Sequence, residues 1–310
     1  MNLSEALNAF ALALEADQRT DSTVRWYVSV LKDYTALHGN KLVTTITVED
    51  NRRFIVEYRR RDARYVGASQ QPEKRGGPSD ASVSALVRAL NGFWNWCERE
   101  ELISRTPMKG IRNNTPRKRA PRAVAESDII RIFDTCEDDI EGYRDRALMA
   151  VMADTGVRVG GLCSIRLKTL NLERGTLVVH EKRGTVRQVP FSSFTALFIH
   201  QWLDHRPRCD HDSLFIGKKK TPLTTWGVYQ MLRRRAAAAG VTGDVHPHAW
   251  REFFARGYLE RGGDVATLSR LLGNSPEVIL KSYTLHTSAE VMESHDKYSP
   301  FKGLIEDRKS

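Results

Sequence analysis

The chain has 310 residues, a formal net charge of +10 and a sequence pI of about 9.5. This length suits two domains with separate cores, and the scattered charges are typical of a globular chain. The longest apolar runs are too short to span a bilayer, and the first twenty residues lack the segments of a secretory signal. We therefore expect a cytoplasmic protein with no membrane partner, and the positive charge favours a polyanionic partner.

The cysteine pattern argues against both a disulfide framework and a zinc finger, because no C-x-x-C pair occurs. The four cysteines are Cys97, Cys136, Cys163 and Cys209. His205, Cys209 and His211 fall close together, but no fourth ligand follows at a spacing that suits a metal site. We interpret this segment as an ordinary loop and predict neither a metal nor a cofactor.

The first hundred residues are predicted to be all-helical. Apolar residues recur at helical spacing in 4–16, 21–39, 47–63 and 80–102. The stretch 66–80 is rich in Gly, Pro and Ser and is predicted to be a loop.

Four aromatic residues of these helices have two interpretations: Trp26, Phe93, Trp94 and Trp96. Exposed aromatic rings can stack on nucleic-acid bases. Aromatic residues at helical spacing more often belong to a core, and we favour the core for all four.

A basic linker is predicted between the two halves of the chain, because residues 103–125 contain no acidic residue. Pro107, Pro116 and Pro121 prevent a long helix, so the segment should be extended. Such a linker is suited to lie along a phosphate backbone, and the alternative is a solvated linker with no partner. We divide the chain into a helical domain at 1–110, a linker at 111–123 and a second domain at 124–310. The predicted DNA-binding residues are Arg112, Arg117, Lys118, Arg119 and Arg122.

The second domain is predicted to be mainly helical with a small β-element. Two β-branched runs flank a charged turn with Gly184, which predicts a hairpin within 176–192. A further helical stretch is predicted at 288–298, within the tail. The other predicted helices lie in 125–136, 142–156, 192–206, 225–240, 247–263 and 264–275.

Two arginines in this domain can bind one phosphate. Arg158 follows the turn "DTG" and should open a helix, whose N-terminus also attracts phosphate. Arg251 lies three residues after His248, so the two should share a helix face. Two guanidinium groups can hold the non-bridging oxygens of a phosphodiester through their fork geometry, which replaces the charge of a metal ion.

A tyrosine and a lysine complete this chemistry. A phenol has a pKa near 10, so neighbouring arginines and a histidine would help Tyr283 to lose its proton. Lys182, on the hairpin turn, can protonate a leaving oxygen, although a solvated turn lysine is the alternative and Arg183 is a second donor. Tyr258 and Tyr298 compete with Tyr283 as nucleophiles, but Tyr258 lies among apolar residues and Tyr298 lies far from "LLGN".

In order and spacing, these residues resemble the active site of the tyrosine recombinases of the phage-integrase family. That family has "TG-x-R-x-x-E-L", a lysine in a β-turn, "H-x-x-R", "LGH" and a tyrosine soon after. "YRDRALMAVMADTG" and "RQVPF" also match, and "FWNWCEREELISRTPM" resembles the core-binding domain of the family. The matching residues are Thr155, Gly156, Arg158, Leu162, Lys182, His248, Arg251, Leu272, Gly273 and Tyr283.

The sequence departs from the family pattern at three positions. Gly161 stands where the family has an acidic residue that supports the site, so the orientation of Arg158 or of a histidine is either looser or supplied differently. Asn274 stands where the family has His or Trp; it can donate a hydrogen bond to a phosphate oxygen but cannot carry a proton at neutral pH. Glu252 follows Arg251 where the family often has His.

The resemblance implies a helical core-binding domain and a mixed, mainly helical catalytic domain that together bind double-stranded DNA. It implies that Tyr283 forms a 3′-phosphotyrosyl link without metal or ATP, in integration, excision or dimer resolution. It also implies a dimer on each DNA site, a tetrameric synapse, exchange of C-terminal tails, and a protein associated with the nucleoid.

Two alternatives remain at the level of sequence. A type IB topoisomerase-like enzyme would share the cleavage chemistry but rejoin the same strand. A catalytically silent DNA-binding protein of the same fold would bind DNA without a covalent adduct, which the changes at Gly161 and Asn274 make worth testing.

Overall fold

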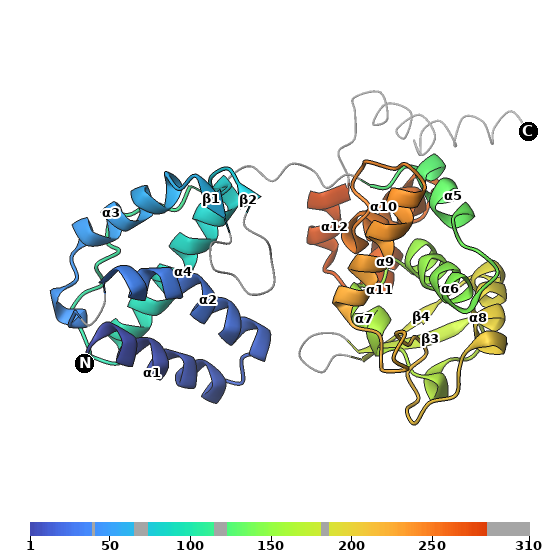
Figure 1. Cartoon of the computed structure of the whole chain (residues 1–310), viewed down its shortest axis with the longest axis horizontal. Helices are drawn as coiled ribbons and strands as arrows, with labels where there is room; N and C mark the ends of the chain where they lie inside the picture. Colours follow the sequence, from blue (N-terminus) through green and yellow to red (C-terminus); the bar gives the residue numbers. More distant parts are fainter. Residues whose placement is uncertain (39–40, 65–73, 115–122, 181–185, 284–310) are drawn as a thin grey trace, which may run out of the picture. The chain divides into compact units, whose positions relative to one another are not determined.

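The computed structural model describes residues 1–38, 41–64, 74–114, 123–180 and 186–283, and Figure 1 shows their helices and strands. The chain divides into two compact units, Met1–Lys118 and Arg119–Ser310. The described part is mainly helical, as predicted, with two small two-stranded sheets. In that part, no helix combines the length and apolar character needed to cross a membrane.

Helices dominate the first unit because their starts carry good capping residues. Asn2 and Glu5 exchange side-chain and backbone hydrogen bonds at the start of α1, and Thr47 and Asp50 do the same for α3. Ser79 caps α4. The elements are α1 Leu3–Ala16, α2 Asp21–His38, η1 Val43–Thr45, α3 Val48–Arg59 and α4 Asp80–Arg99.

Aromatic side chains form much of the core of this unit. Phe93, Trp94 and Trp96 of α4 are all at most 5% exposed, and Phe10 of α1 packs edge-on against Phe93. The predicted core role is therefore confirmed for these three residues of α4. It is wrong for Trp26, which is 36% exposed and packs edge-on against Tyr27 on the surface of α2.

A short pair of strands involves the segment 66–80 that was predicted to be a loop: the second strand lies within it and the first lies just before it. Strand β1 (Ala63–Arg64) pairs antiparallel with β2 (Lys74–Arg75), in the register Ala63↔Arg75. The Gly and Pro content that predicted a loop is compatible with the chain reversal, but it gives no sign of two paired residues at each end.

The second unit is built around helix α6. Its residues Ala147, Leu148, Met149, Val151 and Met152 are all at most 1% exposed, because α8 and α10 pack against it. The elements of this unit are α5 Glu126–Asp134, α6 Ile140–Thr155, α7 Val159–Ser164, η2 Leu167–Thr169, β3 Thr176–His180, β4 Val186–Pro190, α8 Ser193–His205, α9 Thr225–Ala238, α10 Pro247–Glu260, α11 Val265–Leu272 and α12 Pro276–Tyr283.

A buried ionic network joins α9 to α6. The Asp145 carboxylate is fully buried and accepts hydrogen bonds from Arg144 Nη2 (2.7 Å) and Arg235 Nε (2.9 Å). Arg234 Nη2 lies 3.2 Å from the same carboxylate. A buried carboxylate surrounded by guanidinium groups fixes the register of the two helices, because moving either one would leave charges unpaired.

The predicted hairpin of the second unit is present. β3 and β4 pair antiparallel from Thr176↔Pro190 to His180↔Val186. The turn at 181–185, the linker segment 115–122 and the predicted helix at 288–298 lie outside the described residues.

Candidate active site

The turn after α6 brings the first arginine into place. Gly156 ends α6 with φ 58° and ψ 21°, the left-handed conformation that favours glycine. A Cβ at Gly156 would lie 2.5 Å from Phe254 Cδ1 and 2.8 Å from Leu272 Cδ2, so a larger residue would displace these side chains. Two residues later Arg158 is the N-cap of α7, as expected for a residue that opens a helix, and its side chain is exposed.

The second arginine is buried and held by backbone carbonyls. Arg251 is 3% exposed; its Nη1 donates to Gly156 O (2.6 Å) and its Nη2 to Leu272 O (2.7 Å). His248 lies near the start of α10, less than one turn before Arg251, and is exposed. The two residues that the spacing predicted on one helix face therefore differ in burial: Arg251 is buried and His248 is exposed.

Three arginines converge on the C-terminal end of α11. Arg187 of β4 donates to Leu271 O, Arg251 to Leu272 O, and Arg158 Nη2 lies 3.4 Å from Gly273 O. The last carbonyls of a helix have no partner within the helix and carry its negative dipole end, so cations bind them favourably. Backbone carbonyls from three consecutive residues thus orient three side chains that come from separate elements. Figure 1 shows α10, α11 and α12 grouped together.

Asn274 contacts Arg158 directly. Arg158 Nη2 donates to Asn274 Oδ1. A guanidinium has no acceptor atom, so the amide oxygen must face it and the amide nitrogen must face away. Asn274 therefore supplies an acceptor to Arg158, a role that the sequence did not predict.

Gly161 leaves room for the hairpin rather than for a carboxylate. A Cβ at Gly161 would lie 3.3 Å from Val179 Cβ on β3. Val179 is fully buried, so the hairpin packs closely on α7 at the position where the family has its acidic residue. Glu252 is also fully buried, and its Oε1 lies 3.7 Å from Arg256 Nε.

Helix α12 ends at Tyr283, the predicted nucleophile. Ile279 anchors this helix in a small apolar cluster with Leu272, Leu268 and Ala255. Tyr258, one of the rival tyrosines, is half-buried on α10 and packs against Phe254. The structure describes neither the Tyr283 side chain nor Lys182, Arg183 and Tyr298.

Arg187 is a site residue that the sequence analysis missed. The phrase "RQVPF" matched the family, but it gave Arg187 no role. Its contact is with a backbone carbonyl 84 residues away, and a carbonyl leaves no mark in the amino-acid sequence. The position of Arg187 opposite Val179 in the hairpin was the available signal.

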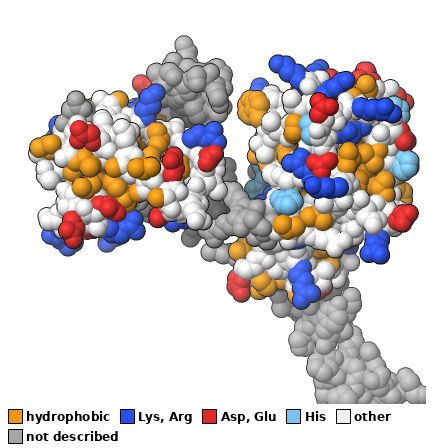
Figure 2. Space-filling model, turned by 90° about the horizontal axis from the view of Figure 1, so that it is seen from below, with side chains coloured by type: hydrophobic (Ala, Val, Ile, Leu, Met, Phe, Trp, Pro, Cys, Tyr) orange, Lys and Arg blue, Asp and Glu red, His pale blue; other side chains and the backbone are white. Residues whose placement is uncertain are grey.

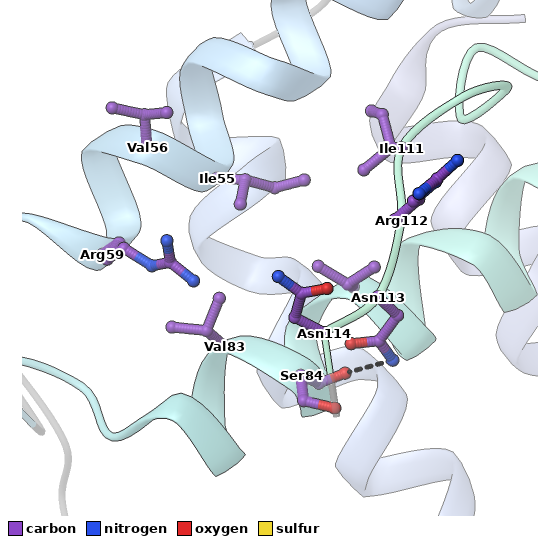
Figure 3. Close-up of a pocket in the computed structure, with 10 residues that line it drawn as sticks. Ile55, Val56, Arg59, Val83, Ser84, Ile111, Arg112, Asn113 and Asn114 are labelled. Carbon is purple, nitrogen blue, oxygen red and sulfur yellow. Dashed lines mark hydrogen bonds between the residues drawn. The ribbon is translucent and has the colours of Figure 1, made fainter. Parts of the chain in front are cut away.

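Of the predicted basic linker, the structure describes residues 111–114 and 123. Arg112 is exposed and lines a pocket of about 170 Å³ between α3, α4 and residues 111–114, all in the first unit. In Figure 3, Arg59 reaches toward this pocket from α3, and Asn113 donates to the Ser84 carbonyl.

Lys and Arg side chains also occur on both units in Figure 2, so positive charge is not confined to the linker. The other predicted DNA-binding residues lie outside the described ranges: Arg117, Lys118, Arg119 and Arg122.

The described part of the site brings two guanidinium groups to the end of α11, from which α12 leads to Tyr283. Among the described residues, no group of three His, Cys, Asp or Glu side chains is placed to hold a metal ion.

Comparison with known proteins gives the family. Residues 122–290 match the phage integrase family, which is more than half of the chain. The chain therefore belongs to the phage integrase family, and its activity is that of a tyrosine-type site-specific recombinase. The topoisomerase-like and catalytically silent alternatives are not favoured.

Individual relatives agree with this assignment. The tyrosine recombinase XerC of Bacillus subtilis (strain 168) is 29% identical over 226 residues, which cover 70% of this chain and 74% of that protein. XerC of Alcanivorax borkumensis is 28% identical over 290 residues, covering 91% and 90%.

Solved structures share the fold. A lambda integrase tetramer bound to a Holliday junction has a TM-score of 0.70 at 16% identity, covering 92% of this chain and 78% of that chain. The Tn1549 transposon integrase in complex with transposon right end DNA has a TM-score of 0.73 at 13% identity, covering 96% and 99%.

Proposed function

We propose that this recombinase cleaves and rejoins duplex DNA through a phosphotyrosine at Tyr283. The observation that supports this most strongly is the convergence of Arg158, Arg251 and Asn274 on the end of α11, from which α12 leads directly to Tyr283. A scissile phosphate held by the two arginines would lie beside the helix that carries the nucleophile.

Each residue then has a role in the reaction. The Tyr283 phenolate attacks phosphorus, the bond to the 5′ oxygen breaks, and Lys182 donates a proton to the departing oxygen. His248 takes the phenol proton. Arg158 and Arg251 stabilise the charge that develops on the non-bridging oxygens, because a guanidinium with five N–H groups can hold carbonyls and a phosphate at once.

The reverse step joins new strands. The 5′-hydroxyl of a partner duplex attacks the 3′-phosphotyrosyl bond, and the phenolate leaves. The energy of the phosphodiester bond is kept in the covalent link, so no ATP is needed. Hydrolysis of that link would destroy it, so a site closed to water favours strand transfer.

We further propose that DNA is bound by the helical domain at 1–110, the basic linker at 111–123 and the catalytic domain at 124–310. The net charge of +10 and the acid-free stretch 103–125 support this. Each phosphate neutralised by the linker would release counterions, so affinity should fall steeply with salt concentration.

An assembly of several copies is part of the proposal. Lambda integrase has been solved as a dimer bound to a core site and as a tetramer bound to a Holliday junction. We propose the same sequence here: a dimer on each site, then a tetrameric synapse, on chromosomal DNA in the cytoplasm.

Covalent capture from a DNA library tests this function. Fragmented genomic DNA would be incubated with the wild type and with Tyr283→Phe, stopped with SDS, and protein-linked fragments would be sequenced. The proposal predicts that wild type alone recovers fragments sharing an inverted-repeat site. Two such sites on one plasmid should then recombine. Relaxation of the plasmid without exchange would favour a topoisomerase, and no adduct with salt-sensitive binding would favour a silent DNA-binding protein.

A further inference from the structure

We propose that Arg187 is a positioning residue, which holds the β3–β4 hairpin against the end of α11 so that the hairpin turn presents its general acid. The proposal rests on the proposed function, in which Lys182 of that turn protonates the leaving oxygen. Arg187 itself contacts backbone and not DNA in this account.

The register of the hairpin places Arg187 where it can do this. Arg187 pairs with Val179 across the two strands, so both side chains leave the same face of the sheet. Val179 is fully buried and lies next to Gly161 of α7. This contact fixes how closely the hairpin approaches α7. With the hairpin held at this distance, the Arg187 side chain donates a hydrogen bond to Leu271 O at the end of α11.

A second anchor lies on the other strand. The His180 backbone N–H donates to Ser164 Oγ (2.9 Å), and Ser164 Oγ donates in turn to Gly161 O (2.7 Å). His180 is the last residue of β3, and Arg187 is the second residue of β4. The turn 181–185 is therefore flanked by two tertiary hydrogen bonds, one to α7 and one to α11.

The loss of Arg187 should affect the hairpin more than α11. The end of α11 still receives Arg251 and Arg158, which hold the carbonyls of Leu272 and Gly273. On strand β4, the hydrogen bond from Arg187 to Leu271 O connects the hairpin to α11. Displacing a catalytic group by about 1 Å can cost roughly a hundredfold in rate.

A sulfur-substituted substrate separates this role from a merely structural one. The substrate would carry sulfur in place of the bridging 5′ oxygen at the cleavage site. A thiolate leaves without a proton because its conjugate acid has a pKa near 8.5, so it does not need the general acid. Adduct formation would be measured under single-turnover conditions with saturating DNA for wild type, Lys182→Met, Arg187→Met and Ser164→Ala. Arg174→Met is the matched control, because Arg174 is an exposed arginine at the base of the same hairpin.

On the oxygen substrate, we expect Arg187→Met to be slower by roughly a hundredfold, Ser164→Ala to be slower as well, and Arg174→Met to equal wild type. On the sulfur substrate, Lys182→Met and Arg187→Met should both approach the wild-type rate. Arg187→Lys, which keeps one donor, should fall between Arg187→Met and wild type, and it replaces Arg187→Met if that variant does not fold.

Three results would count against the proposal in distinguishable ways. If Lys182→Met recovers on sulfur and Arg187→Met does not, Arg187 does not act through the hairpin turn. If Lys182→Met itself fails to recover, the acid role of Lys182 and the positioning role of Arg187 are both wrong. If wild type forms no adduct on either substrate, the proposed function is wrong.

Discussion

Asn274 should act on the reaction through Arg158, which a double-mutant cycle can test. The perturbation is Asn274→Ala, which removes the Oδ1 acceptor and leaves the nearby Gly273 carbonyl in place. If Asn274 serves only to orient Arg158, then removing it should matter only when Arg158 is present. The cycle compares wild type, Asn274→Ala, Arg158→Ala and the double variant.

The size of the effect follows from the exposure of Arg158. A hydrogen bond to a charged group contributes about 1.5–3 kcal/mol. Arg158 is exposed, so water competes for its donors and the lower end applies. A loss of about 1.5 kcal/mol of transition-state stabilisation corresponds to roughly a tenfold slower cleavage rate.

The assay is single-turnover adduct formation at saturating DNA. Asn274→Ala should be roughly tenfold slower than wild type, and the same change should have little effect in the Arg158→Ala background. If Asn274→Ala slows the Arg158→Ala variant by the same factor of about ten, the two losses are independent and this reasoning is refuted. Asn274 would then contact the phosphate independently of Arg158.

Three further predictions concern buried or partly buried groups of the two units. Asp145→Asn should lower the free energy of unfolding of the second unit by about 3–5 kcal/mol, whereas Asp138→Asn, which removes the charge of an exposed carboxylate, should change it by less than about 1 kcal/mol. Hydrogen exchange of α6 and α9 peptides measures both, and equal effects would contradict the buried network. Arg251→Lys should cost about 1–3 kcal/mol in the same measurement, because one lysine cannot reach both Gly156 O and Leu272 O; unchanged exchange would show that the carbonyl contacts are dispensable. Burial raises the pKa of Cys97 to about 12 and of Cys163 to about 11. At pH 8 both thiols should therefore react slowly with iodoacetamide until urea unfolds the protein. Fast labelling of the native protein would mean that they are accessible thiolates.

Much of the fold could be predicted from local patterns. Apolar spacing and turn residues indicated most helices of both units and the β3–β4 hairpin, because these depend on short-range periodicity, but they did not indicate α12. Trp26 shows where this fails: its helical spacing resembles that of the buried α4 aromatics, but the facing of α2 depends on tertiary packing. The two-residue strands β1 and β2 are too short to leave any periodic pattern.

The residue types of the candidate site were predictable, and their contacts were not. Arg158, His248 and Arg251 were predicted because phosphate chemistry needs such side chains and because their order resembles that of the phage-integrase family. The groups that orient the two arginines are largely the carbonyls of Gly156, Leu272 and Gly273. Every residue has a carbonyl, so only the structure shows which ones lie at an unpaired helix end.

Two of the three departures from the family pattern, Gly161 and Asn274, have a joint explanation. Without a carboxylate at Gly161, the hairpin packs directly on α7 through Val179. Arg158 is then oriented by Asn274 and the end of α11 instead. Neither substitution on its own predicts the other, because the link between them runs through the fold.

Peptide mapping of the covalent adduct tests the central claim most directly. Wild type, Tyr283→Phe and Tyr298→Phe would be incubated with DNA carrying the recovered site, stopped with SDS, and digested with nuclease and protease. We expect wild type and Tyr298→Phe to carry a nucleotide on the peptide that contains "SYTLH", and Tyr283→Phe to carry none. An adduct that persists in Tyr283→Phe, or that maps to another tyrosine, would contradict the account.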